Sequence, residues 1–229
     1  CVIGGSPPLT IPVRVGWLSE SLGSVTYRLL VWVLAPIIRL LWRLEVSGLD
    51  RLPPAGCVVV SNHDSVLDPF FLAAALPRQI HFVGKRELWR SPFLAPVLRS
   101  VGAIPVSRGE GDVAALADAV AVLEAGEIVG LFPEGTVLHH EARRWRRGAA
   151  RLALAAGVPL VPIRLIDSER AFRPVKRELG FPVVRLVIGE PIVVERTTPT
   201  PERATELTEK VRAAVVALGT RLAVDLRPR

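Results

Sequence analysis

Short apolar runs alternate with helix-like segments along most of the chain, and this alternation restricts the fold more than any other feature. The runs are rich in β-branched and aliphatic residues, as buried strands are. We expect strands at 57–61, 80–83, 103–106, 127–132, 158–163 and 183–188. We expect helices at 69–76, 92–100, 112–125, 147–156 and 201–219. Strands separated by helices predict an α/β layered fold, in which a largely parallel central sheet is flanked by helices.

Glycine and proline stand at positions that suit the ends of these helices. Gly102, Gly126 and Gly157 each follow an expected helix, where glycine commonly ends it. Thr200 is suited to cap the last helix and Pro201 to open it. The sequence shows neither an internal repeat nor a low-complexity linker, so we expect one compact domain.

The most hydrophobic window, 25–44, is poorly suited to crossing a membrane, because Arg28, Arg39 and Arg43 interrupt it and Pro36 lies inside it. On a helix these arginines fall within about 60° of one another, with apolar side chains around the rest. We expect an interfacial helix, with its apolar side in lipid and its guanidinium groups among the headgroups. Rings suited to this depth are Trp17, Trp32 and Trp42. A helix packed on the protein's own core is the alternative.

Composition and charge leave several classes of partner open. The chain has 229 residues, of which 50% are hydrophobic, and 29 Lys and Arg against 22 Asp and Glu give a net charge of +7. This charge suits nucleic acid, anionic lipid or a phosphorylated substrate equally well. No basic run is interleaved with aromatic residues, so we expect no nucleic-acid partner. The two cysteines, Cys1 and Cys57, provide no disulfide framework.

The segment Asn62-His63-Asp64-Ser65-Val66-Leu67-Asp68 lies where an expected strand ends and a helix begins. Open α/β sheets present functional side chains at such positions. His63 and Asp68 can approach each other across the turn, which would hold the histidine in one tautomer and let it deprotonate a hydroxyl group. The structural alternative is that Asp68 only caps the helix that Pro69 begins.

Two further segments place polar groups at strand ends. Phe132-Pro133-Glu134-Gly135-Thr136 follows an expected strand, and Gly135 is free to adopt a positive φ that turns backbone amides toward an anion. In the segment 102–108, a short strand delivers Arg108 to its end, where a guanidinium group can clamp a phosphate. Taken alone, each segment is also consistent with an ordinary strand exit or a solvated arginine.

The order and spacing of these segments resemble the glycerolipid acyltransferase family, which includes 1-acylglycerol-3-phosphate acyltransferases. The resemblance extends from about Gly48 to Glu190. Its four blocks are Asn-His-x4-Asp at 62–68, Gly-x-Ile-x-Val-x-Arg at 102–108, Phe-Pro-Glu-Gly-Thr at 132–136 and Val-Pro-Ile at 161–163. Further similar segments are Gly84-Lys85-Arg86-Glu87-Leu88 and 147–153. Four blocks in this order make a specific signal.

The resemblance implies a glycerol-3-phosphate acyltransferase-like fold, with 1–44 as a membrane-interface segment and 45–229 as the catalytic domain. The implied reaction moves a fatty acyl group from acyl-CoA or acyl-carrier protein to the free hydroxyl of a lysophospholipid. The first choice of acceptor is 1-acylglycerol 3-phosphate, which would give phosphatidic acid. The family uses no metal or cofactor. The protein is expected on the cytoplasmic face of the cell membrane, as a peripheral or monotopic protein.

The resemblance also assigns functions to individual residues. His63 would be the general base, and Asp68 would steady the imidazolium that forms. A histidine is suited to remove a proton at neutral pH. Lys85 and Arg108 are the candidates for binding the acceptor phosphate. The remaining predicted substrate-binding residues are Asn62, Glu134, Gly135 and Thr136.

One departure from the family concerns the acceptor. The family usually continues Glu-Gly-Thr with Arg-Ser, whereas Val137 and Leu138 follow here, so a phosphate-binding guanidinium is missing at that position. The identity of the acceptor is therefore open. Arginines that could replace it follow at 143, 144, 146 and 147. Grouped around Trp145, they could equally form a solvated face or a lipid-headgroup face.

Other functions fit the sequence less well. A metal hydrolase could use His63, Asp64 and Asp68 with His139 and His140, but adjacent histidines point in different directions and no known ligand spacing is present. A serine hydrolase would need a Gly-x-Ser-x-Gly elbow, which the sequence lacks. The remaining alternatives are an acyltransferase for another lysolipid and a non-catalytic protein that binds anionic lipid. A pure binding protein has no use for a histidine–aspartate pair.

Overall fold

The computed structural model describes residues 20–107, 113–135, 145–173 and 178–225. The helices are α1 (Glu20–Leu41), α2 (Asp68–Ala75), α3 (Leu94–Ser100), α4 (Val113–Glu124), α5 (Gly148–Ala156) and α6 (Pro201–Asp225). Short 3-10 helices are η1 (Leu49–Arg51), η2 (Arg86–Arg90) and η3 (Ser168–Arg170). The strands are β1 (Glu45–Ser47), β2 (Cys57–Ser61), β3 (Ile80–Lys85), β4 (Ile104–Val106), β5 (Ile128–Leu131), β6 (Leu160–Ile166), β7 (Phe172–Arg173), β8 (Glu178–Leu179) and β9 (Arg185–Ile188).

Within the described part of the chain, seven strands form one mixed sheet in the order β1-β9-β6-β2-β5-β3-β4. All neighbouring strands in it are parallel except β6 and β9, which are antiparallel. The predicted α/β fold with a largely parallel sheet is therefore confirmed. Each expected strand and helix is present, with ends shifted by a few residues.

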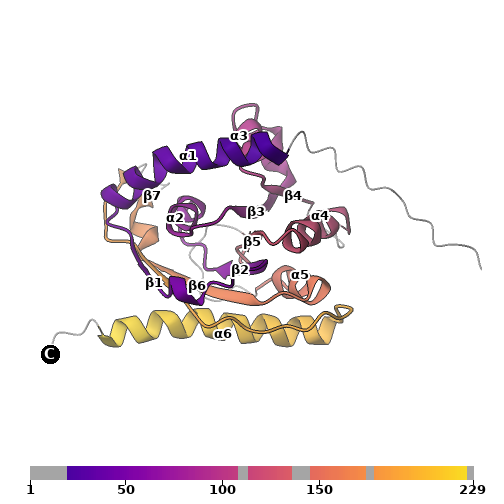
Figure 1. Cartoon of the computed structure of the whole chain (residues 1–229). Helices are drawn as coiled ribbons and strands as arrows, with labels where there is room; N and C mark the ends of the chain where they lie inside the picture. Colours follow the sequence, from indigo (N-terminus) through magenta and orange to yellow (C-terminus); the bar gives the residue numbers. More distant parts are fainter. Residues whose placement is uncertain (1–19, 108–112, 136–144, 174–177, 226–229) are drawn as a thin grey trace, which may run out of the picture.

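The two faces of the sheet carry separate hydrophobic cores, because side chains of a strand alternate between its faces. Val58 and Val60 of β2 pack with residues of α4, α5 and α6. Cys57 and Val59 of the same strand pack with α2 and with Trp42 on the other face. Figure 1 shows the result as layers, with α1 and α2 on one side of the sheet and α6 on the other. A strand covered on both faces needs an unbroken apolar sequence, and every residue of β2 is buried.

α1 packs one side on the domain and exposes the other. Tyr27 and, just after the helix, Trp42 are buried, and the indole Nε1 of Trp42 donates a hydrogen bond of 2.8 Å to the Gly180 carbonyl. Arg39 Nε donates to the Ala74 carbonyl of α2 at 2.9 Å, so this guanidinium binds protein. The opposite side exposes apolar residues: Leu29, Trp32, Val33, Ile37 and Leu40. The structure thus combines both alternatives for this segment, a helix packed on the domain and an unpaired apolar side.

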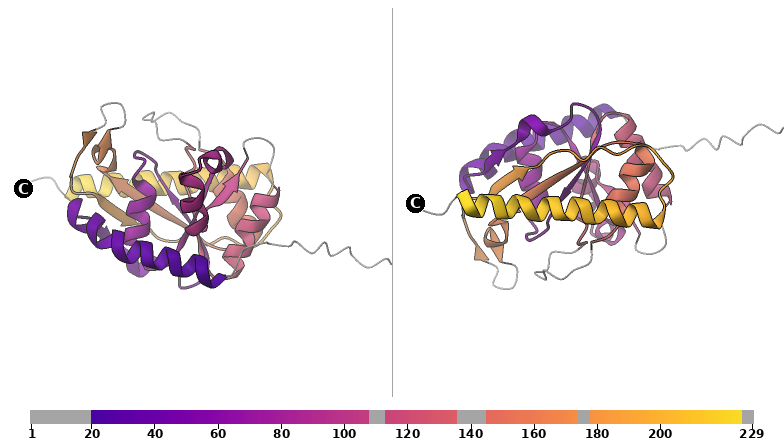
Figure 2. Two further views of the ribbon diagram at one scale, coloured as in Figure 1. Left: turned by 90° about the horizontal axis from the view of Figure 1, so that it is seen from above. Right: turned by 90° about the horizontal axis from the view of Figure 1, so that it is seen from below.

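α1 runs along the domain rather than away from it, and α6 extends across the opposite side of the molecule (Figure 2). No helix among the described residues is both long enough and apolar enough to pass through a bilayer. Helices α3, α4 and α5 are followed by Gly102, Gly126 and Gly157, each with a positive φ, as the sequence predicts.

Candidate active site

Three parallel strands bring the predicted site residues to one edge of the sheet. β2 ends just before Asn62, β3 ends at Lys85, and β5 ends just before Phe132. β5 pairs with both β2 and β3, so the three strand ends are neighbours. Carboxyl ends of parallel strands meet at one edge, which is where α/β folds place their ligands. Segments far apart in the sequence therefore meet for a topological reason.

His63 and Asp68 form the predicted pair. His63 Nδ1 lies 3.0 Å from Asp68 Oδ2, and the Asp68 side chain is fully buried while that of His63 is 15% exposed. A carboxylate only accepts hydrogen bonds, so Nδ1 carries the hydrogen and Nε2 keeps its lone pair. The pair therefore leaves one ring nitrogen able to take a proton.

The turn between His63 and Asp68 is held by three hydrogen bonds, one of which is made by the Asp68 carboxylate. Asp68 Oδ2 also accepts a hydrogen bond of 2.8 Å from the backbone N–H of Ser65. The Asp68 N–H in turn donates to the Ser65 carbonyl at 3.1 Å, and the buried Ser65 hydroxyl accepts from the Leu67 N–H at 3.3 Å. Asp68 is the first residue of α2 rather than its cap, and no side-chain cap bond is present at that helix end. Capping alone therefore does not account for Asp68.

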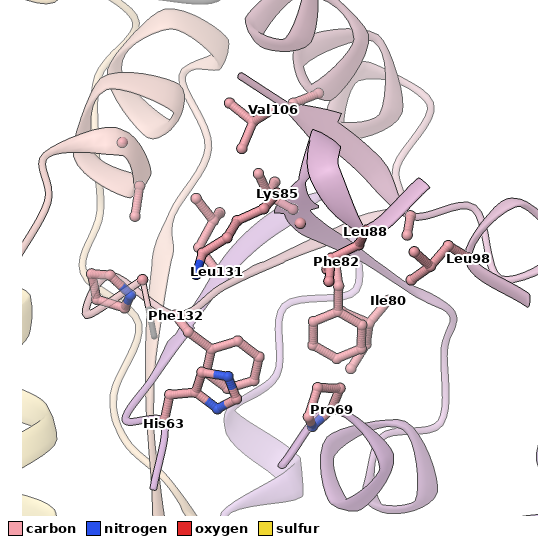
Figure 3. Close-up of a pocket in the computed structure, with 18 of the residues that line it drawn as sticks. His63, Pro69, Ile80, Phe82, Lys85, Leu88, Leu98, Val106, Leu131 and Phe132 are labelled. Atoms are coloured by element: carbon pink, nitrogen blue, oxygen red, sulfur yellow. The ribbon is translucent and has the colours of Figure 1, made fainter. Parts of the chain in front are cut away.

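Phe132 fixes the imidazole from a second strand. Its ring stacks on that of His63, with centroids 4.2 Å apart and planes inclined by 20°. Phe82 of β3 stacks on Phe132 in turn, at 5.8 Å. Figure 3 shows the imidazole lying against the Phe132 ring at one end of a pocket, with Phe82 beyond it. The histidine is thus held by a carboxylate at its edge and by an aromatic ring at its face.

Glu134 lies in the same turn as Phe132, and its surroundings, which include His63, shift its pKa. Its pKa is raised mainly by burial and next by the nearby Asp64 carboxylate. A backbone hydrogen bond from His63, the charge of His63 and the charge of Arg164 act in the opposite direction. Glu134 therefore stands directly beside His63.

Asn62 makes its hydrogen bonds within the protein. Its Oδ1 accepts from the Leu165 N–H at 2.8 Å, and its Nδ2 donates to the Leu165 carbonyl at 2.9 Å. Nδ2 also donates to Asp64 Oδ2 at 2.6 Å. The amide thereby copies a backbone pairing and attaches the end of β2 to β6. This arrangement suits positioning of His63 better than direct contact with a substrate.

A cavity of about 1250 Å³ opens beside His63. It is larger than most ligand pockets, which are roughly 300–1,000 Å³. Apolar side chains of α1, α2, α3, α4 and β3 form most of its wall, and His63, Lys85, Gly135 and Arg146 line it as well. Lys85 extends into it from the end of β3 (Figure 3). Among the residues that the structure describes, no group of three or more His, Cys, Asp or Glu is placed to hold a metal ion.

Comparison with known proteins identifies the family. The family model described as Acyltransferase matches residues 43–166, which include the His63–Asp68 pair, Lys85 and Glu134. The chain belongs to the acyltransferase family. It is therefore an enzyme, and the family predicted from its motifs is confirmed.

Several relatives and one solved structure resemble this acyltransferase. It is 28% identical to the 1-acyl-sn-glycerol-3-phosphate acyltransferase of Bacillus subtilis, over 86% of this chain and 98% of that protein. It is 31% identical to the human 1-acyl-sn-glycerol-3-phosphate acyltransferase alpha, over 81% of this chain and 66% of that protein. The crystal structure of the 1-acyl-sn-glycerophosphate acyltransferase PlsC from Thermotoga maritima matches with a TM-score of 0.63. That match covers 88% of this chain and 84% of the other at 19% identity, so it supports the fold.

The structure unites most of the predicted site residues. His63, Asp68, Glu134, Gly135 and Lys85 lie at one sheet edge. Arg108 and Thr136 lie outside the described residues, as do Val137 and the histidines at 139 and 140.

Two residues of the acyltransferase site went unnoticed in the sequence. The sequence places Phe132 in the Phe-Pro-Glu-Gly-Thr block without assigning it a role, yet its ring stacks on His63. Arg164 follows the Val-Pro-Ile segment on β6, and its charge lowers the pKa of Glu134. The one available signal for Arg164 was a cation near the end of a strand that borders β2.

Proposed function

We propose that the acyltransferase moves a fatty acyl group from a thioester, acyl-CoA or acyl-carrier protein, to the free hydroxyl of 1-acylglycerol 3-phosphate. The observation that carries the proposal is the 3.0 Å contact between His63 and buried Asp68 beside a large apolar cavity. A pair of this kind suits removal of a proton from a hydroxyl, and the cavity suits an acyl chain. The relatives named as 1-acyl-sn-glycerol-3-phosphate acyltransferases support this choice of acceptor.

In the proposed reaction, His63 Nε2 takes the proton of the acceptor hydroxyl as its oxygen attacks the thioester carbonyl carbon. The carbon–sulfur bond then breaks, and the leaving thiolate takes the proton back from the imidazolium. The products are the new ester and the free thiol of the carrier. Base catalysis of this kind contributes about 10²–10⁴-fold, so positioning of the two substrates must supply much of the remainder.

Asp68 acts in this scheme through His63. Its Oδ2 keeps the hydrogen on Nδ1 and stabilises the imidazolium while the proton is on Nε2. The second bond to Oδ2, from the Ser65 N–H, prevents the carboxylate from turning away. The stacked Phe132 ring limits rotation of the imidazole about its side-chain bonds. We assign Asn62 to positioning in the same sense, and Lys85 to binding of substrate phosphate.

The exposed apolar side of α1 supports attachment to a membrane surface. On α1, Trp32 is 77% exposed and Leu40 is 78% exposed. Phe93, the residue just before α3, is 87% exposed. α1 packs against α3, so these side chains belong to one side of the molecule. Exposed arginines lie on the same two helices, Arg28 on α1 and Arg99 on α3, and Arg90 at the end of η2 is also exposed. Apolar side chains accompanied by guanidinium groups are typical of proteins that bind anionic lipid surfaces.

The test of the catalytic proposal is His63→Ala. We expect loss of acyl transfer with an unchanged circular dichroism spectrum and thermal transition. His81→Gln is the matched control, because His81, on β3, bonds to the Gly102 carbonyl and is not among the residues that line the cavity. We expect this control to retain activity. A folded, active His63→Ala variant would refute the mechanism.

The acceptor is tested by a panel assayed with acyl-CoA. The panel comprises 1-acylglycerol 3-phosphate, glycerol 3-phosphate and lysophospholipids that carry a head group. We expect the highest kcat/KM with 1-acylglycerol 3-phosphate. A higher value for any other acceptor would redirect the assignment while leaving the His63–Asp68 chemistry in place.

A further inference from the structure

We propose that Arg146 binds the acceptor phosphate alongside Lys85 and so sets the preference for phosphate-bearing acceptors. This inference rests on the proposed function and names a residue within it. Arg146 is one of four arginines, at 143, 144, 146 and 147, among which the sequence alone gives no reason to choose. The structure distinguishes it from its neighbour Arg147 by where each guanidinium group lies.

The Arg146 guanidinium lies directly over Gly135. A Cβ atom placed on Gly135 would be 3.0 Å from Arg146 Nε and 3.2 Å from Cζ. Gly135 has a φ of +72°, so its backbone conformation also disfavours a side chain. The Arg146 N–H donates to the Pro133 carbonyl at 3.0 Å, which anchors the arginine backbone to the same turn. Because Gly135 has no side chain, the Arg146 guanidinium can lie close to the turn that follows β5.

This turn places Arg146 near the catalytic histidine. The Gly135 N–H donates to the Phe132 carbonyl at 3.0 Å, which closes a tight turn. The α-carbons at the two ends of such a turn are less than about 7 Å apart. Phe132 stacks on His63, and the cavity that His63 lines is lined by both Arg146 and Arg147, so the contact with Gly135 is what distinguishes Arg146. The Arg146 guanidinium thus lies against one end of this β-turn, at Gly135, and the His63 ring lies against the other end, at Phe132.

Arg146 is also a cation that the described protein leaves unpaired. It is exposed, and no carboxylate among the described residues forms an ion pair with it. Arg147 differs, because its Nη1 reaches toward the Pro201 carbonyl and the Thr205 hydroxyl of α6, at 3.5 Å each. Both residues are exposed and line the cavity, but Arg146 lies against Gly135, whereas the Arg147 guanidinium is directed toward α6. Arg147 is therefore a matched control of equal charge.

The chemistry of the acceptor favours a cation at this place. In 1-acylglycerol 3-phosphate, only two carbons and one oxygen separate the reacting hydroxyl oxygen from phosphorus. A hydroxyl held at His63 Nε2 therefore brings its phosphate close to the turn that carries Phe132 and Gly135. A guanidinium group can bind such a phosphate through two parallel hydrogen bonds. The family usually has an arginine at the position that Val137 occupies here, and Arg146 would supply the missing cation.

The experiment compares Arg146→Gln with Arg147→Gln in neutral detergent micelles, where no anionic lipid contributes to attraction. Each variant is assayed with 1-acylglycerol 3-phosphate and with 1-monoacylglycerol, which has the same hydroxyl but no phosphate. For Arg146→Gln we expect the KM for the phosphate acceptor to rise roughly 10- to 100-fold, as loss of a charged hydrogen bond predicts. We expect a smaller change in kcat and no change in the KM for acyl-CoA. Arg146→Lys, which keeps the charge but loses the planar fork, should fall between.

Several outcomes would overturn the proposal. One is an Arg146→Gln variant whose KM for the phosphate acceptor equals that of Arg147→Gln. Another is an increase confined to the KM for acyl-CoA, which would place Arg146 on the phosphates of the donor. Wild-type protein that turns over none of the acceptors would instead refute the proposed function itself. Circular dichroism and thermal unfolding of each variant exclude misfolding as the cause of a change.

Discussion

One oxygen atom, Asp68 Oδ2, connects the chemistry of the site to its local structure. It contacts His63 Nδ1 at 3.0 Å and accepts the Ser65 N–H at 2.8 Å, while the other oxygen, Oδ1, is buried without a hydrogen-bond partner among the described residues. The same carboxylate therefore orients the imidazole of His63 and closes the turn that carries it. Substitutions can separate these two effects.

Asp68→Asn and Asp68→Ala are expected to lose activity to a similar extent but to differ in stability. The amide oxygen of Asn can still accept the Ser65 N–H, whereas Ala leaves that buried donor unpaired, which costs about 1–3 kcal/mol. Neither variant stabilises the imidazolium, so kcat should fall by about 10²–10⁴ in both. Urea denaturation and initial-rate assays measure the two effects. An Asp68→Asn variant with wild-type kcat would show that His63 does not need the carboxylate.

Glu134 makes the stability of the protein depend on pH. Burial and the Asp64 charge raise its pKa, so over the pH range just above the unfolded value the native state binds more protons than the unfolded state. The contribution of Glu134 to stability is therefore complete at acid pH and is lost as the pH rises. Relative to wild type, Glu134→Gln should be more stable at about pH 7.5 than at about pH 4. Denaturation of both proteins at these two pH values measures this, and a pH-independent difference would contradict it.

The sequence predicts the location of the site better than its internal contacts. His63, Glu134 and Lys85 follow separate strands, and parallel strands end at one edge, so their convergence follows from the pattern alone. The stacking of Phe132 on His63 and of Arg146 on Gly135 depends on side-chain orientation across turns. Sequence spacing carries no information about such orientations. Asn62 shows the same limit, because its amide bonds to Leu165 on a distant strand.

At the scale of elements, apolar runs identify the apolar strands, including β4 at one edge of the sheet, but not the short polar strand β1 at the other edge. β2 is buried throughout and was predicted at its observed bounds. β1 is Glu45-Val46-Ser47, with two exposed residues and one partly buried residue, and neither apolar content nor alternation marks so short a strand in the sequence. The antiparallel direction of β9 was also beyond prediction, since the apolar sequence of a strand does not encode its direction. The N-terminal helix ends at Leu41, so Arg43 lies after it and not on its face.

The exposed side of α1 is expected to bind lipid vesicles through its apolar residues. Trp32→Ser should weaken binding by about tenfold or more, because burying a large apolar side chain contributes roughly 1.5–3 kcal/mol. Val193→Ser is the control, since Val193 is 85% exposed but lies beyond β9, away from α1. Sedimentation with vesicles gives both affinities. Equal weakening by the two substitutions would show that α1 has no special part in binding.

At the scale of the whole molecule, the cavity beside His63 and the exposed apolar surface are formed partly by the same helices. α1 and α3 each contribute side chains to the cavity wall, among them Leu34, Ile38, Val97 and Leu98. The other side of α1 exposes Trp32 and Leu40, and Phe93, just before α3, is also exposed. A protein attached to lipid through these helices would have its cavity next to the bilayer, where acyl chains are available. α6 lies on the opposite side of the sheet and leaves this surface open (Figure 1).

The net charge of +7 predicts how such attachment depends on salt. Basic residues near an anionic membrane contribute about 1 kcal/mol each, and this attraction acts only within the Debye length, which shrinks from about 10 Å at 0.1 M salt to about 3 Å at 1 M. We expect binding to anionic vesicles to weaken steeply as salt rises and then to level off at the affinity measured with zwitterionic vesicles. The plateau reports apolar contact, so Trp32→Ser should lower it and leave the salt-dependent part of the curve unchanged. Binding that falls to zero at high salt would show that charge alone holds the protein to the membrane and that the apolar side of α1 stays outside the lipid.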